Sequence, residues 1–191
     1  MSKLGLAATV AVAATLVFST PAMAQAAKKK SRQPLSPHET VKATVDGNEL
    51  KLVYGRPYTT KPGTSEVRKI WGGLVPFGKV WRTGADEATT FTTTGALMFG
   101  SLHVPAGTYA LFTIPGEKEW TVILNKVSKT WGAFDYEKNK AQDLGQIKVP
   151  VEHLSEPLEQ LTISIEAGAG QNGTLKIAWE TSRVSVPLMV H

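Results

Sequence analysis

The sequence lacks cysteine altogether. It therefore forms no disulfide, no thiolate metal site and no cysteine nucleophile, and it offers no thiol for lipid attachment. The four histidines are spread singly, without a spacing that would place two of them on one metal ion. A serine nucleophile elbow and a phosphate-binding glycine loop are also missing. The sequence thus predicts no metal site and no cofactor, and the protein is not expected to be a lipoprotein.

An excess of one charge is absent from most of the chain. Of 191 residues, 21 are Lys or Arg and 16 are Asp or Glu, but five of the cations precede residue 39 and no acid does. From residue 39 onward the two signs are therefore equal, at 16 each. A nucleic-acid-binding domain needs a basic face that displaces counterions from phosphates. We therefore expect no nucleic-acid partner.

No apolar stretch is long enough to predict a membrane span. Residues 4–18 form an apolar run of 15 residues, whereas a spanning helix needs about 20. Lys3 precedes this run and Ala22-Met23-Ala24 follows it, which is the pattern of a cleaved signal peptide. We expect residues 1–24 to be removed, leaving a soluble periplasmic or extracellular protein without stable membrane insertion. Residues 25–38 are predicted to be a flexible basic linker that either aids solubility or contacts anionic lipid or polymer.

Helical periodicity is scarce from residue 40 onward, where apolar residues instead recur at every second position, for example over 161–165, 175–179 and 184–190. Residues 109–114 and 121–124 are apolar on both faces, which is typical of central strands. A hairpin is predicted around Asp46-Gly47-Asn48, and short helical turns are predicted near 65–70 and 136–143.

These patterns predict an all-β fold. About ten strands favour a single-domain antiparallel β-sandwich over residues 39–191, with barrel-like closure as the alternative. A domain of about 150 residues buries enough surface to fold without disulfides.

The strongest candidate site is the run from Trp81 to Glu87, where charges and a glycine interrupt an apolar and threonine-rich region. Arg82 presents a planar set of donors suited to a carboxylate, sulfate or phosphate, and Trp81 offers a flat face for stacking. Asp86 and Glu87 would point to opposite sides of an extended chain, so only one of them is expected to share a site with Arg82. A structural Arg–carboxylate pair explains the same residues equally well.

Two further features extend this candidate site. Arg56 follows a predicted strand and precedes Pro57, so it could converge with Arg82 on an anion, although a single arginine at a turn is more often a solvated or capping charge. The aromatic residues Trp131, Phe134 and Tyr136 lie among small and acidic residues, which suggests a groove built by loops.

Several strings resemble a known family. They are Leu52-Val-Tyr-Gly-Arg-Pro57, Gly73-Leu-Val-Pro-Phe-Gly-Lys-Val-Trp-Arg-Thr-Gly-Ala-Asp-Glu-Ala-Thr89, Val104-Pro-Ala-Gly-Thr-Tyr-Ala-Leu-Phe-Thr-Ile-Pro115, Trp131-Gly-Ala-Phe-Asp-Tyr136 and Leu161-Thr-Ile-Ser-Ile165. Over about residues 40–188 the chain resembles the secreted bacterial family catalogued as domain of unknown function 2911. The resemblance implies export, a single domain and interest in Arg56, Arg82 and Glu87. The family usually carries Asn where this chain has Asp86, so that carboxylate is not expected to act as an acid or base.

Three hypotheses of function follow. The first is non-catalytic binding of a small polar or anionic ligand, or of an envelope partner, through Arg82, Glu87, Arg56 and Trp81. The second is a hydrolase in which Glu87 is the general acid or base and Arg82 stabilises developing negative charge. The third is a structural or interaction protein in which these charges pair internally.

Overall fold

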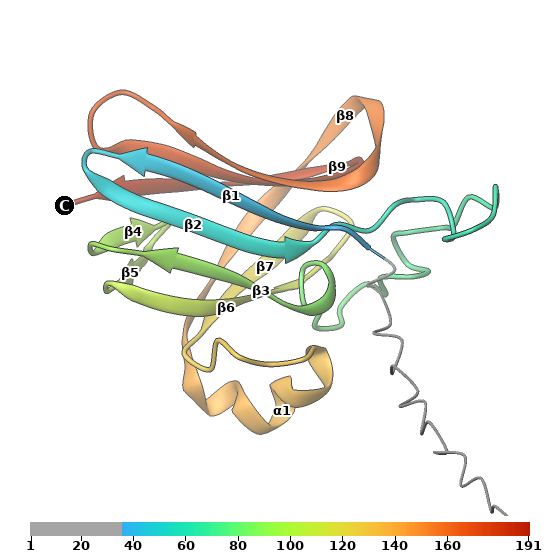
Figure 1. Cartoon of the computed structure of the whole chain (residues 1–191), viewed down its shortest axis with the longest axis horizontal. Helices are drawn as coiled ribbons and strands as arrows, with labels where there is room; N and C mark the ends of the chain where they lie inside the picture. Colours follow the sequence, from blue (N-terminus) through green and yellow to red (C-terminus); the bar gives the residue numbers. More distant parts are fainter. Residues whose placement is uncertain (1–35) are drawn as a thin grey trace, which may run out of the picture. The chain divides into compact units, whose positions relative to one another are not determined.

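The computed structural model describes residues 36–191 (Figure 1). The predicted signal peptide and most of the predicted linker lie outside these residues. Within 36–191, no helix is long and apolar enough to cross a membrane. The fold is all-β, as predicted. Its nine strands are β1 (His38–Val45), β2 (Asn48–Gly55), β3 (Ala85–Thr93), β4 (Leu97–Phe99), β5 (Leu102–Val104), β6 (Gly107–Ile114), β7 (Glu119–Asn125), β8 (Asp143–Ala167) and β9 (Asn172–Val190).

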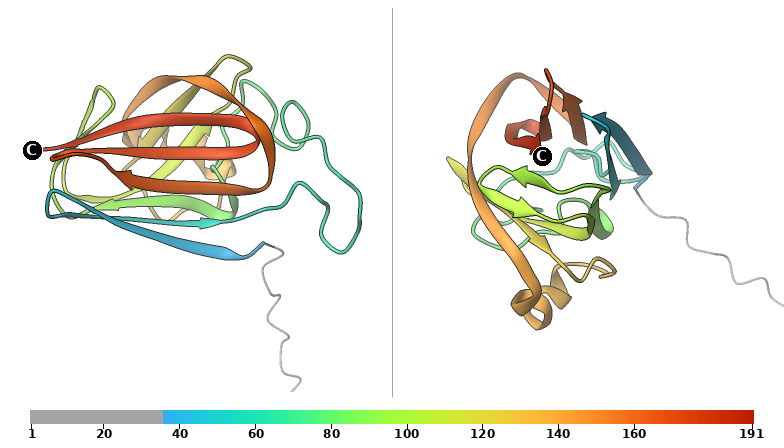
Figure 2. Two further views of the ribbon diagram at one scale, coloured as in Figure 1. Left: turned by 90° about the horizontal axis from the view of Figure 1, so that it is seen from above. Right: turned by 90° about the vertical axis from the view of Figure 1, so that its left-hand side faces the viewer.

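All strand pairs are antiparallel, and the strands form one sheet in the order β1-β2-β3-β6-β7-β8-β9-β4-β5, which is not closed. The long strand β8 pairs with β7 up to Pro150 and with β9 from Val151 onward. It thereby carries the sheet around the core, so that one continuous sheet supplies both layers (Figures 1 and 2).

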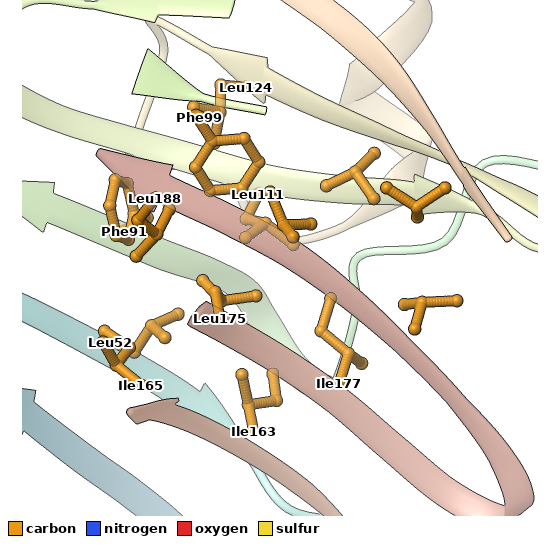
Figure 3. Packing of buried hydrophobic residues seen from close by; sticks show 14 of the residues in the cluster. Leu52, Phe91, Phe99, Leu111, Leu124, Ile163, Ile165, Leu175, Ile177 and Leu188 are labelled. Atoms are coloured by element: carbon orange, nitrogen blue, oxygen red, sulfur yellow. The ribbon is translucent and has the colours of Figure 1, made fainter. Parts of the chain in front are cut away.

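The core lies between these layers. It is built from the alternating residues that the sequence pattern assigned to strand interiors, such as Leu161, Ile163 and Ile165 of β8, which are buried. All nine strands contribute side chains to it. Among them are Phe91 of β3 and Phe99 of β4, whose ring centroids are 5.5 Å apart (Figure 3). Burial of this apolar surface, at roughly 25 cal/mol per Å², is the main force that holds the curled sheet together.

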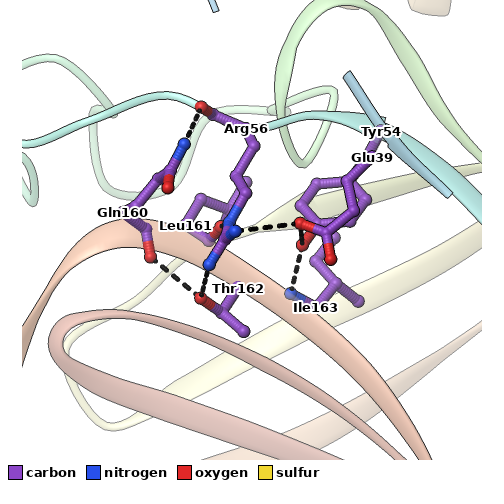
Figure 4. Close-up of polar contacts among 7 residues, drawn as sticks. All are labelled: Glu39, Tyr54, Arg56, Gln160, Leu161, Thr162 and Ile163. Carbon is purple, nitrogen blue, oxygen red and sulfur yellow. Dashed lines mark hydrogen bonds and ion pairs between the residues drawn. The ribbon is translucent and has the colours of Figure 1, made fainter. Parts of the chain in front are cut away.

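Side chains at the end of β2 and directly after it join this strand to β8 (Figure 4). Tyr54 Oη accepts a hydrogen bond from the Ile163 amide at 3.0 Å. Arg56 Nε donates to the Leu161 carbonyl at 2.9 Å, and its Nη1 lies 3.1 Å from a carboxylate oxygen of Glu39. The two β8 backbone groups that accept or donate these bonds face away from β9 and have no neighbouring strand within residues 36–191 to pair with. At a sheet edge such groups would otherwise bond to water.

Local helical structure agrees with the sequence in one place and differs in the other. The helix α1 (Tyr136–Asn139), with the 3₁₀ turns η1 (Ala133–Asp135) and η2 (Lys140–Gln142) beside it, confirms the prediction near 136–143. No helix forms over 65–70, where that prediction was wrong.

In that stretch the chain doubles back instead. Thr60 bridges to Val67 across a turn in which Gly63 has φ +75°. The β-branched Thr60 and Val67 favour this extended pairing over a helix, and Pro62-Gly63 favours the turn.

Candidate functional site

A pocket of about 350 Å³ opens between the loop that joins β2 to β3, the start of β3 and the turn before α1. We call residues 56–84 the β2–β3 loop. The pocket combines aromatic and aliphatic walls with charged groups, and the lining residues used below are Arg68, Leu74, Trp81, Arg82, Asp86, Phe134 and Trp179. This mixture of apolar surface and a few polar groups is typical of small-molecule sites.

Indole rings form one wall of the pocket. Trp81 and Trp179 stack with centroids 6.1 Å apart and planes 20° apart. Trp71 packs edge-on against both, and Trp120 lies 4.8 Å from Trp71. Trp81 is also held by its ring nitrogen, which donates to the Gly84 carbonyl at 3.2 Å. The wall is therefore rigid, because each pocket-facing ring is fixed by its neighbours.

The backbone around Arg82 is strained. Thr83 and Asp86 have φ of 57° and 64°, and positive φ is rare for a β-branched residue such as threonine. Thr83 is fully buried, where its hydroxyl lies 3.1 Å from that of Thr113 and its carbonyl accepts from the Thr89 hydroxyl at 2.9 Å. Neighbouring structure thus holds the turn in an unfavourable conformation, which is a feature that clusters at functional sites.

Two glycines let the ends of β2 and β3 cross closely beside the pocket. A Cβ on Gly55 would lie 2.2 Å from the Ala85 carbonyl oxygen, and one on Gly84 would lie 2.9 Å from the Gly55 carbonyl oxygen. No larger residue fits at Gly55 without a backbone shift. The close crossing fixes where the turn that contains Arg82 ends and β3 begins.

Two half-buried arginines line the pocket without a carboxylate partner. Arg82 Nε donates weakly to the Gly84 carbonyl at 3.4 Å, and Arg68 donates to the carbonyls of Tyr58 and Thr59. None of the ion pairs found within residues 36–191 includes either arginine.

The other two arginines of that range are paired with glutamates. Arg56 lies 3.1 Å from Glu39, and Arg183 lies 2.6 Å from Glu152. The pair with Arg183 lowers the pKa of Glu152, because the guanidinium donates to its carboxylate. The pocket thus collects the arginines whose charge no described acid neutralises.

The structure brings Trp81 and Arg82 together in this pocket and places the other two predicted residues elsewhere. Glu87 does not line it. Its side chain is 54% exposed, with a carboxylate oxygen 3.6 Å from the His38 ring nitrogen. Arg56 binds Glu39 and β8 rather than converging with Arg82.

Only one of the two adjacent acids shares the pocket with Arg82, as the sequence suggested, and that acid is Asp86. Its carboxylate lies 3.3 Å from His38 Nε2. The pocket therefore offers an anion the guanidinium groups of Arg68 and Arg82, while its one acid, Asp86, contacts His38.

Sequence reasoning did not identify Arg68, Leu74 or Trp179 as pocket residues. Arg68 lies in the stretch for which a helical turn was predicted. Trp179 follows the alternating pattern of 175–179, which predicts an ordinary core residue of a strand. Phe134, which sequence reasoning had placed in a loop-built groove, does reach the pocket, and it is 81% exposed. Tyr136 is buried instead, and its hydroxyl donates to the carboxylate of Asp143, at the start of β8, at 2.7 Å.

Comparison with known proteins identifies the family. Residues 36–188 match the family described as "Protein of unknown function (DUF2911)", and the chain belongs to that family. No curated protein and no solved structure matches the chain.

Proposed function

We propose that this protein binds, without transforming it, a small organic anion that carries an apolar portion. The observation that supports this most strongly is the pair Arg68 and Arg82, which line one pocket and have no carboxylate partner among the described residues. A partly desolvated guanidinium without a counter-ion is costly, and an anionic ligand would remove that cost. Trp81, Trp179 and Phe134 would cover the apolar portion of the ligand.

The geometry favours binding over hydrolysis. A general acid or base must lie within hydrogen-bond reach of the reacting group. Glu87 lies outside the pocket and is more than half exposed, and the Asp86 carboxylate contacts His38. A hydrolase would lose turnover in Glu87→Gln, whereas the binding proposal expects that variant to keep its ligand affinity.

We also propose that the protein acts after export, in the periplasm or outside the cell. This rests on the signal-peptide pattern of residues 1–24.

Calorimetric titration tests the binding proposal. The chain that remains after the predicted cleavage, residues 25–191, is titrated with benzoate, phenylphosphonate and, as a neutral control, benzamide. We expect the two anions to bind and benzamide not to. Arg82→Met and Arg68→Met should each weaken anion binding at least about tenfold, since a hydrogen bond to a charged group contributes about 1.5–3 kcal/mol.

Arg183→Met is the matched control, because it removes the same side chain from a site outside the pocket. It should leave the affinity unchanged. The proposal fails if wild type binds neither anion, or if Arg82→Met binds them as wild type does.

A further inference from the structure

The β2–β3 loop has a charge balance unlike that of the rest of the domain. Of the 16 cations and 16 acids from residue 39 onward, the loop holds six cations and one acid, which leaves ten cations and fifteen acids elsewhere. The single acid, Glu66, pairs with Lys61 at 3.3 Å. Arg68, Lys69 and Lys79 are in none of the ion pairs found within residues 36–191. The loop therefore presents a concentrated, uncompensated positive charge.

The same loop exposes large apolar side chains. Of the seven large hydrophobic residues that are exposed within residues 36–191, the loop supplies Tyr58, Val67, Leu74 and Phe77, and Val67 is 73% exposed. Phe134, in the turn before α1, is a fifth exposed apolar side chain, and it lines the same pocket as Leu74. A soluble surface rarely gathers apolar side chains in this way unless they meet a partner.

The loop lies where a flat surface can reach it. It extends beyond the end of the sheet, at the opposite end from the C-terminus (Figures 1 and 2). At 29 residues without a named strand or helix, it is also much longer than an ordinary connection, and connections of that length are usually functional.

We propose that the β2–β3 loop, with Phe134, docks on an anionic lipid bilayer. Cations beside exposed apolar side chains match the two layers of such a surface, because lysine and arginine contact the charged headgroups while apolar side chains enter the acyl boundary. Aliphatic residues such as Val67 and Leu74 favour lipid over a nucleic acid. A nucleic-acid site would instead present aromatic side chains that stack on bases, together with cations that contact phosphates. The inference stands independently of the ligand in the pocket.

Co-sedimentation of residues 25–191 with vesicles tests this inference, using phosphatidylcholine vesicles with and without phosphatidylglycerol. We expect binding only to the vesicles that contain phosphatidylglycerol, and weaker binding in high salt. The double variant Lys69→Gln with Lys79→Gln should lose at least about tenfold in partitioning, and Val67→Ser should also bind less. None of these three residues lines the pocket, so the variants should keep phenylphosphonate binding.

Two sets of controls locate the surface. Met189→Ser removes an exposed apolar side chain next to the C-terminus, and Lys148→Gln removes an exposed cation on β8; both should bind vesicles as wild type does. Replacing the basic run Lys28–Arg32 by serine should leave most of the binding intact. The inference is overturned if that replacement alone abolishes binding, if the loop variants bind as wild type, if neutral vesicles bind equally well, or if a DNA oligonucleotide displaces the vesicles.

Discussion

The guanidinium of Arg82 lies against the backbone of Gly132. A Cβ at position 132 would come within 2.9 Å of Arg82 Nη1, which is closer than a side-chain carbon normally approaches. The backbone of Gly132 is extended, with φ 173°, so the glycine is needed for space rather than for an unusual conformation. The space it leaves is occupied by one of the two cations of the pocket.

Gly132→Ala should therefore disturb the pocket without unfolding the protein. The added methyl group meets the mobile end of the Arg82 side chain, which can move aside, so we expect the free energy of unfolding to change by less than about 1 kcal/mol. Phenylphosphonate affinity should fall by about tenfold, because the displaced guanidinium loses its alignment with the anion. Urea unfolding and calorimetric titration measure the two effects. An unchanged affinity would mean that Arg82 does not hold the anion.

Asp86→Asn should strengthen anion binding. Asp86 is the acid that lines the pocket beside Arg82. Its negative charge repels an anionic ligand, so we expect its removal to raise the affinity for phenylphosphonate a few-fold. Asparagine tolerates the positive φ of this position, so the turn should persist. Glu87→Gln is the matched control, since it removes the adjacent charge outside the pocket. Weaker binding in Asp86→Asn would contradict this arrangement of charges.

Arg56→Met should destabilise the protein. This side chain donates to the Leu161 carbonyl and the Thr162 hydroxyl and pairs with Glu39, so its loss strands acceptors at the edge of β8. We expect a loss of about 2–3 kcal/mol in the free energy of unfolding. Arg183→Met, which breaks a partly exposed cross-strand pair, should cost at most about 1 kcal/mol. Equal losses in the two variants would show that Arg56 does not hold the sheet edge.

Tyr54→Phe should change how stability depends on alkaline pH. Burial raises the pKa of Tyr54 to about 12, from 10.0 for an ordinary tyrosine. Since the folded pKa is the higher one, the phenol stabilises the protein fully below about pH 10, and this contribution is lost as pH rises from about 10 to 12. At pH 8 the variant should be less stable by about 1–3 kcal/mol, because the Ile163 amide loses its acceptor. The gap should narrow above pH 10 in urea unfolding. Tyr58→Phe removes a hydroxyl from an exposed side chain and should leave the stability at pH 8 unchanged.

Much of the fold could be predicted from residue patterns. Alternation over 161–165 and 175–179 depends only on which face of a strand is buried, so it located the interior residues correctly. The single sheet could not be predicted, because the passage of β8 from β7 to β9 depends on long-range pairing. The strand count was nearly right, at about ten against nine.

The candidate site was less predictable. Trp81 and Arg82 were recognised because charges stood out in an apolar run. The positive φ of Asp86 could not be read from its residue type, and Asp86 rather than Glu87 lines the pocket. Arg68 was missed because its loop packs against residues distant in the sequence. The equal totals of positive and negative charge also concealed the cationic β2–β3 loop, since net charge carries no information on where charges gather.

One experiment tests directly whether Arg82 serves a ligand rather than the fold. Urea unfolding is measured for wild type and Arg82→Met, each with and without phenylphosphonate at about 100 times its dissociation constant for wild type. The account predicts that the two proteins differ by less than about 1 kcal/mol without the anion. With it, wild type should gain about 2.7 kcal/mol and the variant much less. A loss of about 3–5 kcal/mol in Arg82→Met without the anion, as large as that from breaking a buried ion pair, would instead show that the fold depends on Arg82, and the account would be contradicted.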